Sequence, residues 1–231
     1  MKILSKVVDS VGVGTGIQLI ESMYATREDG VRHLQLHLER LAASAVALSF
    51  RLDACALRSR LLNLCSGLSE QTPYRLRVVL AADGATEITH APLTPLNDGS
   101  ALVLPSDEHG FSATASEDPL LLHKTTRREI YDCAWREAES LGAFDMLFFN
   151  ERDELAEGGR SNVFVKLNGR WWTPPISSGL LPGVMRGVLM EKTELNVTLR
   201  VLSRQDLLRA DELIVCNALR GALKAELIHR R

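Results

Sequence analysis

The chain has 231 residues, of which 45% are hydrophobic and 24% charged, and its formal net charge at pH 7 is −2. This length and composition are typical of a soluble protein of one or two domains, and no basic cluster with interleaved aromatic residues suggests a nucleic-acid partner. No run approaches the roughly 20 apolar residues of a membrane span, and residues 1–14 lack the apolar core and cleavage site of a signal peptide. We therefore expect a cytoplasmic protein without a membrane partner.

Neither a metal site nor a disulfide framework is predicted. Cys55, Cys65, Cys133 and Cys216 show no C-x-x-C spacing, so we interpret them as buried or incidental thiols. His33 and His37 are separated by one helical turn, but no third ligand or glutamate base accompanies them. We therefore assign this histidine pair to the polar face of a helix.

The first half of the chain predicts a small subdomain of helices and strands. Apolar residues recur at three- and four-residue intervals over 33–49, which predicts an amphipathic helix. The other expected elements are a strand with a turn and return over 14–30, a helix over 53–64, and strands over 75–80 and 101–104. The polar stretch 106–119 resembles a linker, so we place a boundary near residue 115, between subdomains 1–115 and 116–231.

The second half alternates strands and helices. Its clearest local signal is Asn168-Gly169 between two strand-like runs, which predicts a tight hairpin. The expected elements are helices over 126–141, 182–195 and 205–210, and strands over 145–150, 161–167, 170–173 and 212–216.

Residues 122–186 contain three features that suit a phosphate-bearing aldehyde cofactor. Lys124 lies between an apolar run and a helix, where a rigid support can hold a reactive amine. Glu157 precedes a glycine bend and supplies a carboxylate of the kind that keeps a pyridine nitrogen protonated. Pro182 and Gly183 introduce a helix whose first amides, those of Val184 and Met185, would face a phosphate.

The motifs HKTT, E-x-x-x-S-N, W-x-T-P-P and G-x-L-P-G-x-x-R follow one another in this order. Together they resemble the class IV pyridoxal-phosphate enzymes, which include branched-chain and D-amino-acid aminotransferases and 4-amino-4-deoxychorismate lyases. The resemblance implies an α/β (α+β) protein of fold type IV, with pyridoxal 5'-phosphate between two subdomains. It also implies a small-molecule amine substrate and a homodimer.

The resemblance also implies roles for individual residues. Lys124 would be the Schiff-base lysine and the general acid and base, and Glu157 would pair with the ring nitrogen. The further cofactor contacts would come from Arg40, Asn162, Leu181, Val184, Met185, Asn217 and Ala218. The pair Glu21-Ser22 stands where the family often has Glu-Thr near its active site, and it fits a surface hairpin equally well.

Three features favour the lyase within this family. Glu129 stands where branched-chain aminotransferases carry tyrosine, Met185 gives G-V-M-R, and both the tail ADELIVCNAL and SEDPLLLHKTTRR resemble the lyase. We therefore expect a 4-amino-4-deoxychorismate lyase that releases pyruvate and 4-aminobenzoate for folate synthesis. The alternatives are a class IV aminotransferase acting on branched-chain or D-amino acids, and a non-catalytic partner of aminodeoxychorismate synthase.

One expected substrate motif is missing. No R-G-x-G-x-R-G-Y segment, which some lyases use for substrate carboxylates, follows Arg77. The candidates for carboxylate binding are then Arg160, which we place first, and Arg27 and Arg220.

Overall fold

The computed structural model describes residues 16–96, 99 and 101–228, so the expectation for residues 1–14 lies outside the described residues. The chain forms two compact units: unit 1 comprises residues up to Leu93 and Lys124–Arg127, and unit 2 comprises Thr94–His123 and Arg128–Arg231. The boundary expected near residue 115 lies inside unit 2. The reason is that β5 (Ala101–Pro105) is hydrogen-bonded on both sides to strands of that unit.

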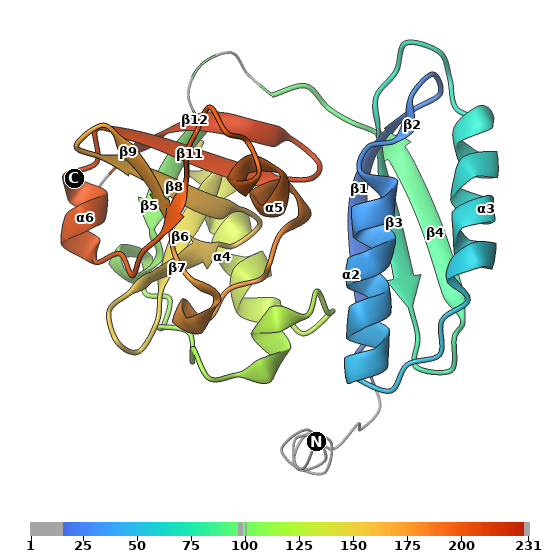
Figure 1. Ribbon diagram of the computed structural model, residues 1–231, viewed down its shortest axis with the longest axis horizontal. Coiled ribbons are helices and arrows are strands. Elements are labelled where there is room, and N and C mark those ends of the chain that lie inside the picture. The colour runs from blue at the N-terminus through green and yellow to red at the C-terminus, as the bar shows by residue number, and fades with distance from the viewer. Residues whose placement is uncertain (1–15, 97–98, 100, 229–231) are drawn as a thin grey trace. The chain divides into compact units, whose positions relative to one another are not determined.

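Unit 1 is an antiparallel sheet covered by two helices (Figure 1). The strand order is β2-β1-β3-β4, with β1 Leu19–Thr26, β2 Gly30–Val31, β3 Tyr74–Leu80 and β4 Thr86–Pro92. The helices are α2 Leu34–Ala47 and α3 Ala54–Ser66. Leu19, Met23 and Ala25 share one face of β1 and belong to the core that the two helices complete.

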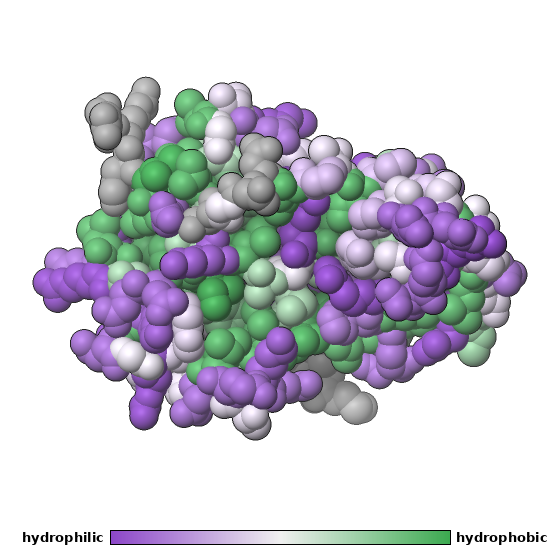
Figure 2. Space-filling model, turned by 90° about the horizontal axis from the view of Figure 1, so that it is seen from above, coloured by the Kyte–Doolittle hydropathy of each residue, from purple (hydrophilic) through white to green (hydrophobic). Residues whose placement is uncertain are grey.

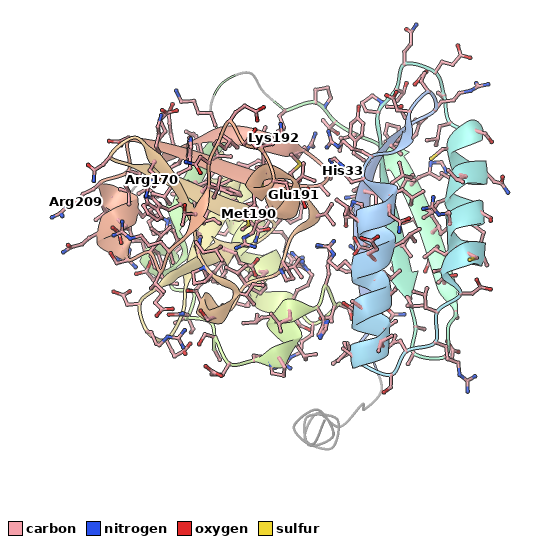
Figure 3. The ribbon with its side chains drawn as sticks, viewed as in Figure 1. His33, Arg170, Met190, Glu191, Lys192 and Arg209 are labelled. Carbon is pink, nitrogen blue, oxygen red and sulfur yellow. The ribbon has the colours of Figure 1, made fainter. Side chains whose placement is uncertain are left out.

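The helices of unit 1 begin and end within two residues of the predicted bounds. Leu34, Leu38, Leu41 and Ala45 form the buried stripe of α2. The α3 helix starts after Asp53, whose side chain accepts a hydrogen bond from the Ala56 amide at 2.8 Å. His33, at the N-cap of α2, has φ 57°, and it is one of the residues labelled in Figure 3.

Unit 2 is built on an eight-stranded mixed sheet in the order β10-β9-β8-β11-β12-β5-β6-β7 (Figure 1). Its other strands are β6 Asp145–Phe149, β7 Leu155–Gly158, β8 Asn162–Leu167, β9 Arg170–Thr173, β10 Thr198–Leu199, β11 Glu212–Asn217 and β12 Gly221–Leu227. Its α-helices are α4 Glu129–Ser140, α5 Val184–Met190 and α6 Arg204–Leu208, and its 3₁₀ turns are η1 Ser106–His109, η2 Pro119–Leu122 and η3 Ile176–Ser178.

The predicted hairpin is confirmed. Strands β8 and β9 pair antiparallel around Asn168 and Gly169, which have φ 50° and 76°. Positive φ at both central positions is the geometry that an Asn-Gly turn provides at low strain. This hairpin and β11 form one side of a core that contains Val163, Val165 and Val215.

Two helices of unit 2 are clearly shorter than predicted. The helix predicted to begin at residue 126 begins at Glu129, because Thr125 and Thr126 pair instead with the start of β1; the Thr126 amide donates to the Gln18 carbonyl at 2.9 Å. The helix predicted over 182–195 is α5, which ends at Met190. The chain then turns, and Asn196 adopts φ 43° before β10.

Four strands were not expected from the sequence, namely β4, β7, β10 and β12. Strand β4 has no fully buried residue, so it lacks the apolar alternation of a half-buried strand. Strand β7 has the sequence LAEG, which is poor in strand-forming residues, although all four are buried. Tertiary pairing with β6 therefore determines β7, the strand that carries Glu157.

In the described part of the chain, no helix has both the length and the apolar character needed to cross a bilayer. The surface is mixed, and Figure 2 shows green, hydrophobic residues among purple, hydrophilic ones in the view from above. The exposed large apolar side chains of unit 2 include Leu141, Ile176, Leu199, Val201 and Leu208. Single apolar residues of this kind are ordinary on protein surfaces.

Two neighbouring leucines of α3 test the assignment of the unit 1 core. Leu61 is 0% exposed and Leu62 is 49% exposed. We expect Leu61→Ala to lower the free energy of unfolding by about 2–5 kcal/mol, because it leaves a cavity, and Leu62→Ala to change it by no more than about 0.5 kcal/mol. Urea denaturation of both variants measures the difference. Equal effects would contradict the packing of α3 on the sheet.

Candidate cofactor site

Glu157 is the centre of the candidate site in unit 2. It lies on β7 and is 7% exposed, so it is neither a loop residue nor a surface acid. Its Oε2 accepts a hydrogen bond from the Leu181 amide at 3.1 Å and another from Asn162 Nδ2 at 3.3 Å. Both donors are N–H groups, and a carboxylate held in this way can face a protonated pyridine nitrogen.

Asn162 begins β8 and connects Glu157 to the turn before α5. Its Nδ2 also donates to the Leu181 carbonyl at 2.9 Å. A Cβ placed on Gly183 would lie 2.0 Å from Asn162 Oδ1. Only glycine therefore allows the backbone of this turn to approach the amide so closely.

The turn leads into α5, which begins at Val184 with Gly183 as its N-cap. Val184 and Met185 are 7% and 9% exposed. Because the first amides of a helix have no intrahelical acceptor, these two residues supply backbone donors at the place the sequence predicts. Leu181, just before the turn, is partly exposed.

The glycine bend between β7 and β8 is held by a buried acid. Asp145 is 0% exposed and accepts hydrogen bonds from Ser161 Oγ at 2.6 Å and the Arg160 amide at 3.0 Å. Burial raises the pKa of Asp145, and these donors oppose the rise. A Cβ on Gly158 would lie 2.4 Å from Asp145 Oδ2, so this bend also requires glycine.

The structure gives Arg160 contacts within unit 2. Its Nε and Nη2 donate to the Phe144 carbonyl at 3.1 and 2.7 Å, and its guanidinium lies 4.7 Å from the centre of the Trp135 ring. Among the other candidates, Arg27 pairs with Glu70 at 3.4 Å, and Arg220 Nη1 donates to the Thr94 carbonyl at 2.6 Å. Carboxylate binding by any of these three arginines stays a prediction.

Asn217 and Ala218 lie where β11 turns toward β12. The Asn217 side chain donates to the Arg160 carbonyl at 3.1 Å and accepts from the Arg220 amide at 2.8 Å. This side chain therefore fixes the turn and ties it to the glycine bend before β8. The backbone of Ala218 follows in the same turn.

Lys124 lies in the part of the chain assigned to unit 1. Its carbonyl accepts the Ile20 amide at 2.8 Å, and Thr125 forms a bridge with Leu19. The lysine backbone is thus fixed on β1, as a reactive amine requires, and its residue is partly buried.

Arg40, on α2, is paired with the buried side chain of Glu21, which the sequence assigned equally well to the active site or to a surface hairpin. Its Nε and Nη2 bind the two carboxylate oxygens of Glu21 at 2.8 and 2.6 Å. His37 Nδ1 lies 2.6 Å from Glu21 Oε2, and its side chain is 0% exposed. Placing His37 on the solvent-facing side of the helix was therefore wrong, because α2 turns it toward β1.

Burial raises the pKa of Glu21, but the charge of Arg40 and the hydrogen bonds from His37 and Arg40 outweigh this effect and hold the pKa at about 2. Glu21 is therefore ionised throughout the physiological range. As a strand residue at 1% exposure, it is buried rather than part of a surface hairpin.

Two side chains near Glu157 were not found from the sequence. Burial lowers the pKa of Arg186, while Cys216 and Glu157 raise it; the guanidinium is buried and donates to the Pro174 carbonyl at 2.9 Å. Burial and the charge of Glu157 raise the pKa of Tyr131, whose hydroxyl is buried. Arg186 is the last residue of the G-x-L-P-G-x-x-R motif, which could have marked it, whereas no local signal distinguishes Tyr131.

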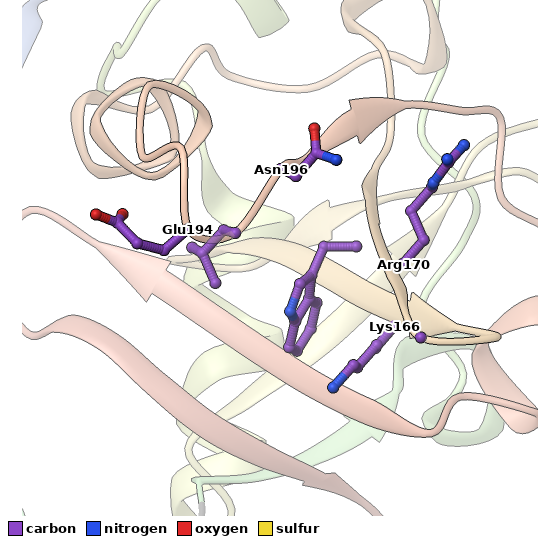
Figure 4. A pocket seen from close by; sticks show the side chains of 7 residues that line it. Lys166, Arg170, Glu194 and Asn196 are labelled. Carbon is purple, nitrogen blue, oxygen red and sulfur yellow. The ribbon is translucent and has the colours of Figure 1, made fainter.

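A surface pocket of about 260 Å³ lies apart from these residues. It is lined by Lys166, Gly169, Arg170, Trp171, Glu194, Leu195 and Asn196, at the β8–β9 hairpin (Figure 4). Lys166 is already paired with Glu212 at 2.6 Å. None of the cofactor residues that the sequence predicts lines this pocket.

No group of three or more His, Cys, Asp or Glu residues with metal-binding geometry occurs among the residues that the structure describes. The four cysteines are free thiols, and burial raises the pKa of Cys216 to about 12. Cys216 is therefore a packed thiol rather than a reactive one.

The residues of unit 2 fit a phosphorylated pyridine cofactor. Glu157 is a buried carboxylate with two N–H donors, as a pyridinium partner requires. Gly183 lets the backbone pass close to Asn162, directly before the first amides of α5. The donor set therefore matches a ring nitrogen and a phosphate.

Comparison with known proteins agrees with this chemistry. The family model Amino-transferase class IV matches residues 18–228. The solved structure of a provisionally named amino-acid aminotransferase from Mesorhizobium loti is 33% identical, with a TM-score of 0.82 over 92% of this chain and 100% of that chain. A provisionally named aminodeoxychorismate lyase from Schizosaccharomyces pombe is 26% identical over 84% of each chain.

A third relative supports the fold alone. The 4-amino-4-deoxychorismate lyase of Pseudomonas aeruginosa is 23% identical, with a TM-score of 0.76 over 94% of this chain and 85% of that chain. The chain belongs to the class IV aminotransferase family, whose fold type IV architecture it shares. It is a pyridoxal-phosphate-dependent enzyme, either a lyase of the aminodeoxychorismate type or a class IV aminotransferase.

Two glycines of the α5 region test the close approach to Asn162. We expect Gly183→Ala to lower the free energy of unfolding by about 1–3 kcal/mol and to weaken pyridoxal-phosphate binding, because the new Cβ displaces Asn162. Gly187→Ala is the control, because nothing lies within 4 Å of its added Cβ, and in a helix it should stabilise by up to about 1 kcal/mol. Thermal unfolding and cofactor titration measure both effects, and a well-tolerated Gly183→Ala would contradict this geometry.

Proposed function

We propose that the protein is a pyridoxal-phosphate-dependent 4-amino-4-deoxychorismate lyase, which releases pyruvate and 4-aminobenzoate for folate synthesis. The relation to the S. pombe protein across 84% of both chains is the observation that carries the choice of lyase. Met185 in the first turn of α5 and Glu129 five residues after Lys124 support it, since both depart from the pattern of branched-chain aminotransferases.

Lys124 and Glu157 would perform the central chemistry. When bound, pyridoxal phosphate supplies an electron sink for bonds broken next to the substrate nitrogen. Lys124 would hold the cofactor through Nζ and then move protons as general acid and base. Glu157 would keep a proton on the ring nitrogen, and its anchoring by the Leu181 amide and Asn162 supports this role.

The remaining residues would position the cofactor. The amides of Val184 and Met185 and the turn at Asn217 and Ala218 would donate to its phosphate, together with Arg40. Leu181 would pack against one face of the ring, and Arg160 remains our first candidate for a substrate carboxylate. These assignments follow the family motifs residue by residue.

A class IV aminotransferase is the second candidate. The M. loti protein, at 33% identity over its whole length, is the observation that favours it. Both reactions use the same lysine and the same ring-nitrogen carboxylate. They differ in which bond breaks next, and the products therefore distinguish them.

The quaternary state belongs to the same proposal. We expect a homodimer in the cytoplasm, and association with aminodeoxychorismate synthase would deliver the substrate. Sedimentation of the protein alone and with the synthase tests both points. A non-catalytic role as a partner of the synthase would require that no amine substrate is turned over.

Product analysis separates the two enzymatic reactions. With pyridoxal phosphate and 4-amino-4-deoxychorismate, we expect 4-aminobenzoate and pyruvate in equal amounts, and Lys124→Ala should lower kcat at least about 1,000-fold because no other amine replaces it. Lys192→Ala is the control, because Lys192 follows α5 as an exposed residue (Figure 3). Keto-acid formation from amino acids without lyase products would favour the aminotransferase, and full activity in Lys124→Ala would contradict its role.

Glu157→Gln tests the ring-nitrogen partner. An amide cannot hold the ring proton as a carboxylate does, so we expect kcat to fall about 100-fold while the Kd for pyridoxal phosphate changes much less. Glu191→Gln, at an exposed position labelled in Figure 3, is the matched control and should leave both constants unchanged. An unaltered kcat in Glu157→Gln would show that the carboxylate has another task.

A further inference from the structure

Glu21, His37 and Arg40 form a buried polar cluster between β1 and α2 of unit 1. The Glu21 and His37 side chains are 2% and 0% exposed, and that of Arg40 is 12% exposed. Of the three guanidinium nitrogens, Nε and Nη2 bind the two Glu21 oxygens. Nη1 has no hydrogen-bond partner among the residues that the structure describes.

This geometry fixes the direction of the guanidinium. Arg40 is a long side chain that could adopt many rotamers, and a two-point contact with a rigid strand residue removes that freedom before any ligand binds. The carboxylate is itself fixed, because His37 Nδ1 lies 2.6 Å from Oε2. The edge of Arg40 that carries Nη1 therefore points away from the Glu21 carboxylate and is preorganised.

The negative charge of Glu21, considered without its orienting effect, would weaken the binding of an anion to Arg40. Glu21 is ionised and neutralises Arg40, so the pair offers a phosphate less attraction than Arg40 alone would. By its charge the carboxylate weakens phosphate binding, and by orienting the guanidinium it strengthens phosphate binding. The two effects predict changes of opposite sign when the carboxylate is removed.

We infer that Glu21 is a positioning residue, which holds Arg40 so that its Nη1 edge binds the cofactor phosphate, and that His37 keeps the Glu21 carboxylate in place. The inference rests on the proposed function, because it assigns the phosphate to Arg40. It adds Glu21 and His37 to the residues proposed for the cofactor site. His37 acts through Nδ1 alone, since its Nε2 is buried without a hydrogen-bond partner in the described structure.

The test compares two aldehydes that differ only in the phosphate. Pyridoxal phosphate and pyridoxal react with the same lysine, so the ratio of their Kd values measures the phosphate preference. In Glu21→Gln we expect the Kd of pyridoxal phosphate to rise about 10–100-fold, the effect of misplacing a charge-assisted hydrogen bond, with the Kd of pyridoxal nearly unchanged. If the Glu21–Arg40 contact only stabilises the fold, Glu21→Gln would raise the Kd of pyridoxal phosphate and the Kd of pyridoxal equally. If Glu21 acts only through its charge, Glu21→Gln would lower the Kd of pyridoxal phosphate. Either result overturns the inference.

A double variant shows whether Glu21 acts through Arg40. We expect Arg40→Met and Glu21→Gln/Arg40→Met to have the same phosphate preference, because Glu21 has nothing left to position. Additive losses would overturn the inference. If wild-type protein binds neither aldehyde, the proposed function fails as well. A wild-type phosphate preference that persists in Glu21→Gln overturns the positioning role alone.

His37 provides a second pair of variants that does not alter the carboxylate. Asn can place an amide nitrogen near the position of Nδ1, so His37→Asn should keep most of the phosphate preference, whereas His37→Leu should lose it about 10-fold. Thermal unfolding of both variants checks that they fold. Equal phosphate preference in His37→Leu and wild type would overturn the part of the inference that concerns His37.

Discussion

The arrangement of the candidate site in unit 2 depends on the contacts of the Asn162 side-chain amide. This amide donates to Glu157 on β7 and to the Leu181 carbonyl, and its oxygen lies against Gly183. One side chain therefore sets the spacing between a buried carboxylate and the first turn of α5. An amide suits this place because its NH₂ group donates both to the Glu157 carboxylate and to the Leu181 carbonyl of the turn, and it carries no charge of its own.

Three buried acidic side chains hold parts of the candidate site in place through hydrogen bonds. Asp145 holds the glycine bend, Glu157 faces the Leu181 amide, and Glu21 holds Arg40. Each loses hydration on burial and regains stability only through donors placed around it. The consequence is that these side chains have little freedom to move, which is the condition for directing a cofactor rather than merely binding one.

The lyases and aminotransferases of this family use the same cofactor-binding residues, so the sequence defines the cofactor more readily than the reaction. A lysine, a ring-nitrogen carboxylate and a phosphate site serve both lyases and aminotransferases of this family. The choice between them depends on groups that contact the substrate beyond the cofactor, and such groups are few and placed case by case. The relatives reflect this, because one bears a lyase name and another an aminotransferase name.

The sequence by itself determined the cofactor class, the amphipathic stripe of α2 and the Asn168-Gly169 hairpin, because motif order and local periodicity are present in the chain before it folds. Only the tertiary structure decided that Glu21 is buried, that α4 begins at Glu129, and that β7 is a strand. The partners responsible are distant in sequence: Arg40 lies 19 residues from Glu21, and Thr126 pairs with Gln18 at a separation of 108. A polar residue in a core position looks like a surface residue until its partner is known, and that partner is fixed by packing rather than by local pattern.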